Sequence, residues 1–397
     1  MIVGLKSILT KQKTVWVIVA TITIIASFQS ILTGTRTLEP GGIEYTRYNN
    51  YQIFEQSYYH LIENKDLYIL YPQEYWDLYK YSPTFSAFFS IFAVFPDWLG
   101  LSLWNLINAF ILVGAVYYLP KFTVYQKGVV TALFLLELLT SIQSEQSNGL
   151  MAGLLVLAFG LLEKKYYFWA TFCLAFTVFV KLFGIVGFAM LLFYPNKFRL
   201  ILYTILSTII LLLVPFIFID IDQYLFLIDS YVKMLANDHS ISYGFSVMGV
   251  LHSWLNIDFN KLVVVGFGAI VFLLPFMRLK FYSNYYFKLL ALCSVLLWVI
   301  IFNHKAESPT FIIAMAGVAI WFVSDKRSKL DLGLLLLAML LTSLSPTDLF
   351  PKFLRDQYVV PFSLKALPCI LIWIKIIYEM LSMKLSSQLK NTPKQVN

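Results

Sequence analysis

The sequence predicts an all-α polytopic membrane protein with about 12 transmembrane helices and a long external first loop that carries amphipathic surface helices. Three observations lead to this fold class. Hydrophobic residues make up 59% of the 397 residues and charged residues only 13%, whereas a soluble domain usually carries about 25% charged residues. The apolar residues form long blocks, such as 15–31 and 200–219, which have the length of membrane spans. The basic residues collect in short loops between these blocks.

The distribution of charge predicts the orientation. Lys and Arg accumulate on cytoplasmic loops, and an N-terminus inside the cell puts basic pairs such as Lys164 and Lys165 on that side. The same orientation puts 17 of the 22 acidic residues and all four histidines outside. The formal charge of +8 therefore indicates membrane orientation, and we expect no nucleic-acid partner.

The apolar block after Lys13 is long and lacks a small-residue cleavage site, so we expect an uncleaved signal anchor. The twelve crossings are expected at 15–32, 99–118, 128–142, 149–162, 166–180, 182–194, 198–219, 261–277, 286–302, 309–324, 330–344 and 361–381. An even number places both termini in the cytoplasm, with 382–397 as a cytoplasmic tail. Residues 1–397 are then a single integral membrane domain. The three cysteines lie in apolar blocks and are expected to be buried free thiols.

The external first loop spans 33–98 and holds ten tyrosines between Tyr45 and Tyr81. Apolar residues recur there at helical spacing, at Tyr51, Phe54, Tyr58, Leu61 and Ile62, while Asn50, Gln52, Glu55, Gln56 and Glu63 fill the opposite face. This pattern predicts an amphipathic helix on the membrane surface. A plain anchor is the alternative, although the loop has more carboxylates than an anchor requires.

The apolar segment 83–95 is too short for a crossing and predicts a buried or interfacial helix. Ser82 is the expected N-cap of this helix, and Pro83 suits its first turn.

Several polar residues lie at membrane depth. In the stretch 143–148, Glu145, Gln146 and Asn148 either close a simple turn or contact a polar ligand. Lys181 interrupts an apolar stretch, which costs about 2.5–3.5 kcal/mol at mid-span and favours a functional role. Its expected partner is a lipid phosphate, and the alternative is snorkelling from a helix end.

Two later loops add further candidates for an external cavity shared with Lys181 and the first loop. Asp238 and His239 lie together in one of them, and His304 and Lys305 lie together in the other. The pattern Asp220-Ile221-Asp222 matches a metal-dependent sugar-nucleotide motif, but we interpret it as a chance match at the end of a span. We expect no metal and no cofactor.

The order of these features resembles a known family. A long external loop ends in Tyr-x-Pro (81–83), a Gln-x-Asn follows at an external junction (146–148), and a span then ends in Lys181. This order is similar to that of the polyprenyl-phosphate-sugar-dependent glycosyltransferases of the C superfamily, and specifically glycosyltransferase family 87. The similarity covers most of residues 15–310.

The resemblance implies a membrane glycosyltransferase that moves a mannose-like hexose or a pentose from a polyprenyl phosphate to a lipid or glycan acceptor. It also implies an inverting step on the external face of a bacterial inner membrane, with a lipid-linked sugar as donor. An acid of the first loop takes the hydroxyl proton. The family's Asp corresponds to Asn50, which cannot act as a base, so Glu44 is our first candidate and Asp77 and Asp238 are the others.

The resemblance also implies a set of groups that bind the sugar and the phosphate. The expected substrate-binding residues are Arg47, Asn49, Tyr81, Glu145, Gln146, Asn148, Lys181, His239, His304 and Lys305.

Two other functions remain open. The first is a lipid or polysaccharide transporter or flippase, although the sequence shows no internal repeat of the kind common in transporters. The second is a catalytically inactive homologue that acts as a binding partner, for which Asn50 is the main support.

Overall fold

The computed structural model describes residues 2–37, 42–237, 242–257 and 260–384. The chain divides into two compact units. Unit 1 contains residues 1–188 and 198–241, and unit 2 contains residues 189–197 and 242–397. The single integral membrane domain expected from the sequence stays a prediction.

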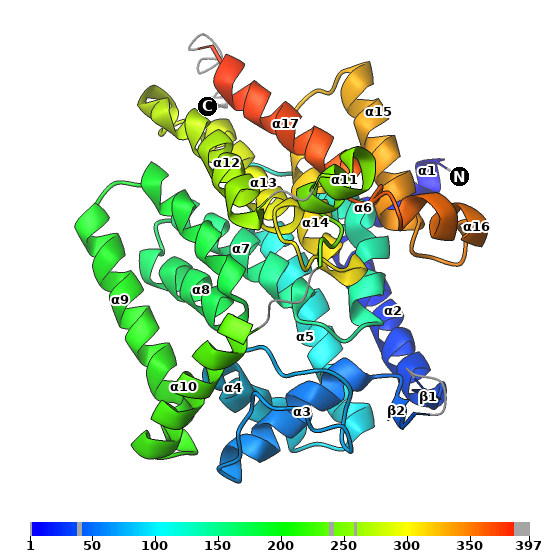
Figure 1. The fold of residues 1–397 in the computed structure, drawn as a ribbon. Coiled ribbons are helices and arrows are strands. Elements are labelled where there is room, and N and C mark those ends of the chain that lie inside the picture. The colour runs from blue at the N-terminus through cyan, green and yellow to red at the C-terminus, as the bar shows by residue number, and fades with distance from the viewer. Residues whose placement is uncertain (1, 38–41, 238–241, 258–259, 385–397) are drawn as a thin grey trace. The chain divides into compact units, whose positions relative to one another are not determined.

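Unit 1 is built from ten α-helices and one small hairpin within its described residues (Figure 1). The helices are α1 (Ile2–Thr10), α2 (Gln12–Leu32), α3 (Asn49–Ile62), α4 (Pro83–Ala93), α5 (Asp97–Tyr118), α6 (Val124–Ile142), α7 (Asn148–Glu163), α8 (Tyr167–Val180), α9 (Lys197–Leu213) and α10 (Ile221–Asn237). Two 3₁₀ segments, η1 (Leu182–Phe193) and η2 (Val214–Ile217), follow α8 and α9. Strands β1 (Thr35–Thr37) and β2 (Glu44–Thr46) pair antiparallel, with Thr35 opposite Thr46.

The core of unit 1 is the packing of α5 against α7 and α2. Glycines on α7 allow the two backbones to approach closely. A Cβ atom added at Gly153 would lie 2.7 Å from the backbone of Ile111 on α5. Small residues at such crossings are typical of helices that pack within a membrane.

The first loop folds onto this core through α3 and α4. Phe54 of α3 meets Phe85 and Phe89 of α4 and Trp104 of α5 in edge-to-face contacts, with ring centroids 5.2–5.8 Å apart. The predicted cap is confirmed, because the Ser82 hydroxyl accepts a hydrogen bond from the Phe85 backbone N–H and Pro83 occupies the first turn. Phe85 and Phe89 are fully buried, whereas Ile91 and Val94 near the end of the segment are 55% and 62% exposed, so the segment has one buried face and one exposed end.

The helix predicted in the first loop is confirmed as α3, but part of its predicted polar face is wrong. Glu55 was expected on the solvated side and is only 6% exposed, whereas Ile62 was expected on the apolar side and is 40% exposed. The reason is that α3 packs on α4 and also contacts α5, where Gln52 bonds Asp97 and Phe54 meets Trp104. A single helical stripe therefore does not describe which of its residues are buried.

Unit 2 contains the remaining helices. They are α11 (Val247–Leu255), α12 (Lys261–Leu273), α13 (Tyr285–Ile301), α14 (Phe311–Val323), α15 (Lys329–Leu337), α16 (Lys352–Leu354) and α17 (Leu367–Ser382), with 3₁₀ segments at Leu274–Met277, Leu279–Phe281 and Ser308–Thr310 and π-helical segments at Ala338–Leu344 and Arg355–Val359. Helices α13 and α14 form its apolar centre, and α17 packs on α13. Cys173 of unit 1 and Cys293 and Cys369 of unit 2 are buried free thiols, as expected.

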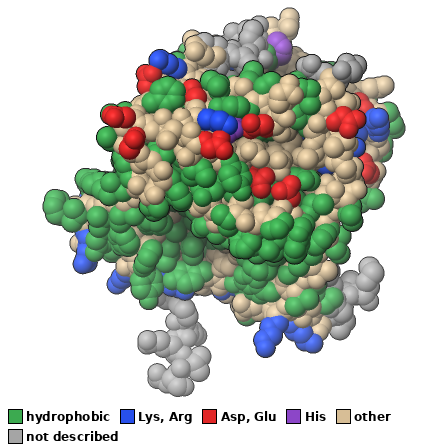
Figure 2. All heavy atoms as spheres, turned by 90° about the horizontal axis from the view of Figure 1, so that it is seen from below, with side chains coloured by type: hydrophobic (Ala, Val, Ile, Leu, Met, Phe, Trp, Pro, Cys, Tyr) green, Lys and Arg blue, Asp and Glu red, His purple; other side chains and the backbone are tan. Residues whose placement is uncertain are grey.

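Each predicted crossing contains helical structure. Among the described residues, four helical stretches are long and apolar enough to span a membrane: Gln12–Leu32, Asp97–Tyr118, Val124–Ile142 and Lys197–Ile217. The total of twelve stays a prediction. Several of the other predicted crossings are short or change helix type. The segment η1 has only 12 residues, but its length is roughly 24 Å because a 3₁₀ helix rises about 2.0 Å per residue. Large hydrophobic side chains are widely exposed (Figure 2), as expected for a lipid-facing protein.

Candidate functional site

The candidate site in unit 1 is centred on Lys181, which directly follows the last residue of α8. The lysine therefore lies at a helix end, between the segments expected at 166–180 and 182–194, as the predicted span boundaries require. Its ammonium is half-buried and donates a hydrogen bond to Asn148 Oδ1 at 3.0 Å. The Asn148 amide in turn donates to Gln146 Oε1 at 2.6 Å. Lys181, Asn148 and Gln146 thus form a hydrogen-bonded row at the start of α7, and Lys181 carries the positive charge at one end of it.

The Tyr-x-Pro motif is held beside this row by hydrogen bonds to backbone carbonyls. The Ser82 hydroxyl donates to the carbonyl of Phe179, two residues before Lys181. The Tyr68 and Tyr79 hydroxyls donate to the carbonyls of Tyr81 and Ser82. These contacts bring the Tyr81 ring centroid to 5.5 Å from the Lys181 ammonium. Two of the ten loop tyrosines, Tyr68 and Tyr79, therefore act as hydrogen-bond donors that fix the motif.

Asn50 joins α3 to the turn between α6 and α7. Its amide donates to the carbonyl of Ser144 at 2.8 Å. The residue at the family's Asp position thus has a structural partner in the turn that leads to Gln146 and Asn148. An aspartate could not donate this hydrogen bond.

Glu145 is an anchor of the same turn. It has a positive φ of 49° and is 1% exposed. Its carboxylate accepts a hydrogen bond from the Ser30 hydroxyl at 2.8 Å, and its carbonyl accepts one from the Trp104 indole at 2.7 Å. Burial raises the pKa of this carboxyl well above its usual range. These contacts to α2 and α5 favour the simple-turn interpretation for Glu145.

The remaining candidates of the first loop lie in its outer part. Glu44 is exposed on β2 and accepts a hydrogen bond from the Thr35 hydroxyl. Arg47 is exposed just after that strand. Asp77 is exposed and lies 3.1 Å from the Lys80 ammonium. Asn49 is buried and exchanges two hydrogen bonds with the backbone of Trp76, which indicates a role in holding the loop.

The other predicted site residues are not part of this arrangement. Asp238 and His239 lie outside the described residues. His304 and Lys305 belong to unit 2, where the carbonyl of His304 accepts a hydrogen bond from the Ser242 hydroxyl. A cavity shared by these loops and Lys181 stays a prediction.

The sequence did not indicate the pairing of two carboxyl groups at the α3–α5 contact. The Gln52 amide donates to both Glu55, at 2.9 Å, and Asp97, at 3.1 Å, and the Tyr48 hydroxyl donates to Asp97. Burial and the nearby Asp97 charge raise the pKa of Glu55 to about 8. No motif signals this pair, because the two residues are 42 positions apart and only the fold brings them together.

Helix α10 was also not predicted, although it supports the first loop. The Ser230 hydroxyl donates to both carboxylate oxygens of Asp66 at 2.7–2.8 Å, and the Tyr68 and Tyr231 rings lie 5.0 Å apart. Asp220, part of the Asp-x-Asp pattern, accepts a hydrogen bond from the Gln223 backbone at the start of this helix. That pattern is thus explained by capping. Within the described residues, no group of three or more His, Cys, Asp and Glu side chains could hold a metal ion.

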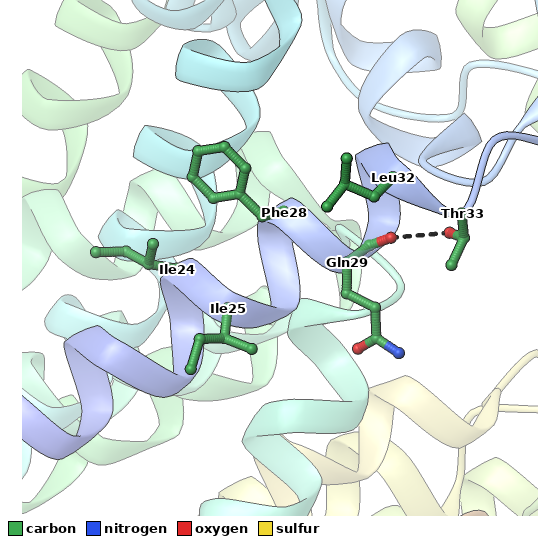
Figure 3. Close-up of a pocket in the computed structure, with 6 residues that line it drawn as sticks. All are labelled: Ile24, Ile25, Phe28, Gln29, Leu32 and Thr33. Carbon is green, nitrogen blue, oxygen red and sulfur yellow. Dashed lines mark hydrogen bonds between the residues drawn. The ribbon is translucent and has the colours of Figure 1, made fainter.

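An apolar groove of about 380 Å³ lies between α4, α8 and the end of α9. Thr84, at the start of α4, and Phe176, on the last turns of α8, line the groove. Thr84 follows Tyr81 by three residues in the chain and Phe176 precedes Lys181 by five, although neither Tyr81 nor Lys181 is among the residues that line the groove. A second hollow, on α2, is formed by six residues of a single helix and its end, with Gln29 and Thr33 as its polar lining residues (Figure 3).

Comparison with known proteins agrees with the resemblance seen in the sequence. The profile of glycosyltransferase family 87 matches residues 79–346, whereas no curated protein matches the chain. The matched region contains Tyr81, Gln146, Asn148 and Lys181, while Glu44, Asn50 and Asp77 precede it. Because the match covers about two thirds of the 397 residues, the chain belongs to glycosyltransferase family 87, a family of membrane glycosyltransferases.

Proposed function

We propose that the protein transfers a sugar from a polyprenyl-phosphate donor to a lipid or glycan acceptor on the external face of a bacterial inner membrane. The observation that carries the proposal is the Lys181 ammonium, which Asn148 holds directly after α8, a helix that also lines an apolar groove. A fixed cation and an apolar groove on the same helix match a donor that has one phosphate and a long hydrocarbon chain.

The ammonium acts on the leaving group. In an inverting transfer, the acceptor oxygen forms a bond to the anomeric carbon while the bond from that carbon to the phosphate oxygen breaks. The electron pair leaves with the phosphate, and a fixed cation stabilises the negative charge that develops there. Asn148 holds Lys181 in position through its side-chain oxygen, so the cation is oriented before the donor binds.

The groove receives the first isoprene units of the donor. It is lined almost entirely by apolar side chains of α4, α8 and η2, including Phe88, Phe172 and Ile217. Its volume of about 380 Å³ is within the usual range of small-ligand sites. Burial of a prenyl chain there is favourable because it removes apolar surface from water.

An acid of an external loop accepts the proton of the attacking hydroxyl. A general base must come within hydrogen-bond reach of that hydroxyl. Glu44 is our first candidate, since it is exposed and can meet an acceptor that arrives from outside. Asp77 and Asp238 are the alternatives. Asn50 can position the turn but cannot take the proton.

The test is transfer by purified protein with radiolabelled polyprenyl-phosphate sugars and membrane-lipid or glycan acceptors. Ala87→Trp would fill the groove, so we expect it to reduce transfer from long-chain donors more than from a donor with two isoprene units. Glu44→Gln should abolish transfer, and transfer that survives it would move the base to Asp77 or Asp238. Transfer from nucleotide sugars, with none from any polyprenyl-phosphate sugar, would refute the donor class.

A further inference from the structure

We propose that a charged cavity in unit 2, at the ends of α13, α15 and α17, binds the head group of a phosphodiester lipid whose head group carries a hydrogen-bond donor. Phosphatidylglycerol and phosphatidylethanolamine share this chemistry. This site is separate from Lys181 and serves to hold a membrane lipid rather than the sugar donor.

The cavity has a volume of about 380 Å³ and mixed charge. Its basic side chains are Lys326, Arg327, Lys375 and Lys384, and its acidic side chains are Asp325, Asp331 and Glu379. The formal balance is therefore one positive charge. A phosphodiester carries one negative charge, which this balance matches.

One ion pair forms a fixed wall of the cavity. The Arg327 guanidinium lies 3.2 Å from Glu379 and also donates to the carbonyl of Trp321 and the hydroxyl of Ser324. Its side chain is 7% exposed. Glu379 also lies 3.4 Å from the Lys375 ammonium, so two cations share this carboxylate. We therefore assign the contact with a phosphate to the exposed cavity residues Lys326 and Lys384.

Asp331 provides the second recognition element. It is 4% exposed, and its Oδ2 atom accepts the backbone N–H of Ser328. Its Oδ1 atom has no hydrogen-bond donor among the described residues. The nearest cation, the Lys375 ammonium, is 3.8 Å away, which is too far for a hydrogen bond. A buried carboxylate oxygen without a donor is costly, and a ligand hydroxyl or ammonium would satisfy it.

Exposed apolar side chains surround this charged cavity. On α17, Ile374 and Tyr378 are 53% and 63% exposed and directly precede the cavity residues Lys375 and Glu379. On α15, Leu330 is 65% exposed next to Asp331. A polar cavity beside lipid-facing residues is suited to a head group whose acyl chains lie along the helices, and basic pockets between membrane helices bind phospholipid head groups in this way.

A purely structural ion network is the competing explanation. Such a network would be expected to satisfy its own buried groups, because ions removed from water are stable only when paired and hydrogen-bonded. Here the network leaves both a cavity and an Asp331 oxygen without a donor. These two observations favour a bound ligand.

The experiment measures binding of short-chain lipids to delipidated protein in detergent by native mass spectrometry. The probes are phosphatidylglycerol, phosphatidylethanolamine, phosphatidylcholine, which has no donor in its head group, and inorganic phosphate. We expect one site that binds the first two lipids at least tenfold more tightly than phosphatidylcholine or phosphate. The variant K326A/K384A should lose at least tenfold in affinity. Both lysine side chains are exposed, so their removal leaves the packing of unit 2 unchanged.

Two further variants separate the explanations. Lys329→Ala removes a neighbouring exposed lysine that does not line the cavity and should bind like the wild type. Asp331→Asn keeps an oxygen for the Ser328 cap and should remove the preference for lipids that carry a donor. Unchanged binding by K326A/K384A, an equal loss in Lys329→Ala, or inorganic phosphate binding as tightly as the lipids would each overturn the proposal.

Discussion

The contact between Lys181 and Asn148 gives the sharpest test of the proposed chemistry. Lys181→Met removes the ammonium while keeping most of the apolar side chain. If the ammonium stabilises the departing phosphate, its loss should cost about 2.7–4 kcal/mol of transition-state stabilisation. We therefore expect kcat to fall roughly 100- to 1000-fold. KM should change little, because this charge interaction strengthens as the phosphate leaves.

Asn148→Ala keeps the ammonium but removes the oxygen that holds it at 3.0 Å. A hydrogen bond to a charged group contributes about 1.5–3 kcal/mol, and only the part that orients the cation affects the reaction. We expect a fall in kcat of roughly tenfold. Since Asn148 acts through Lys181, the double variant should be no worse than Lys181→Met, with a coupling energy of about 1.4 kcal/mol.

The assay is steady-state transfer from a polyprenyl-phosphate sugar, with the melting temperature of each variant measured alongside. Lys164→Met is the matched control, because Lys164 also follows a helix of unit 1 and its ammonium lies 3.3 Å from the Tyr118 ring centroid. Additive losses in the double variant, or an equal loss in Lys164→Met, would refute the proposed role of the contact.

Three other predictions concern the surroundings of the site. Asn50→Asp should lower stability by about 1–3 kcal/mol in a denaturation assay and should not raise activity, because the hydrogen bond donated to the carbonyl of Ser144 is lost; a gain in transfer would contradict this. The pKa of Glu55 rises from 4.5 to about 8 on folding, so the folded state keeps a proton that the unfolded state releases, and stability should fall as pH rises between these values. We expect the free energy of unfolding to fall by about 2 kcal/mol, which is less than the full pKa shift implies because solvent screens the Glu55–Asp97 pair. If the stability of Glu55→Gln depended on pH as strongly as that of the wild type, Glu55 would be excluded as the source. Glu145→Ala should cost about 1–3 kcal/mol by leaving Ser30 without its acceptor, whereas Glu145→Gln should melt near the wild type; equal losses in both would show that charge, rather than the hydrogen bond, matters.

The sequence identified which residues form the site, but it did not show how they are held together. Tyr81, Gln146, Asn148 and Lys181 were all identified from short motifs, and the structure brings them together through direct contacts. Their proximity could not be read from spacing, because it depends on a hydrogen bond between Ser82 and a carbonyl of α8 that is 97 residues away.

The roles of individual acids depended most on tertiary structure. Glu55 and Glu145 have the sequence context of ordinary solvated residues, yet both are buried and hydrogen-bonded. Periodicity describes one face of an isolated helix, so it does not show that α3 is covered from several directions. The same limit explains why the carboxyl pair of Glu55 and Asp97 was not foreseen.

The sequence by itself determined the all-helical class, the positions of the apolar helices, the Ser82 cap and the family resemblance. These features follow from local composition and from short motifs, which act over a few residues. Only the tertiary structure decided that Lys181 bonds Asn148, that Asn50 holds a turn, and that α4, α8 and the end of α9 enclose an apolar groove. The physical reason is that each of these depends on contacts between distant segments, which are fixed by packing and hydrogen bonding of the whole fold.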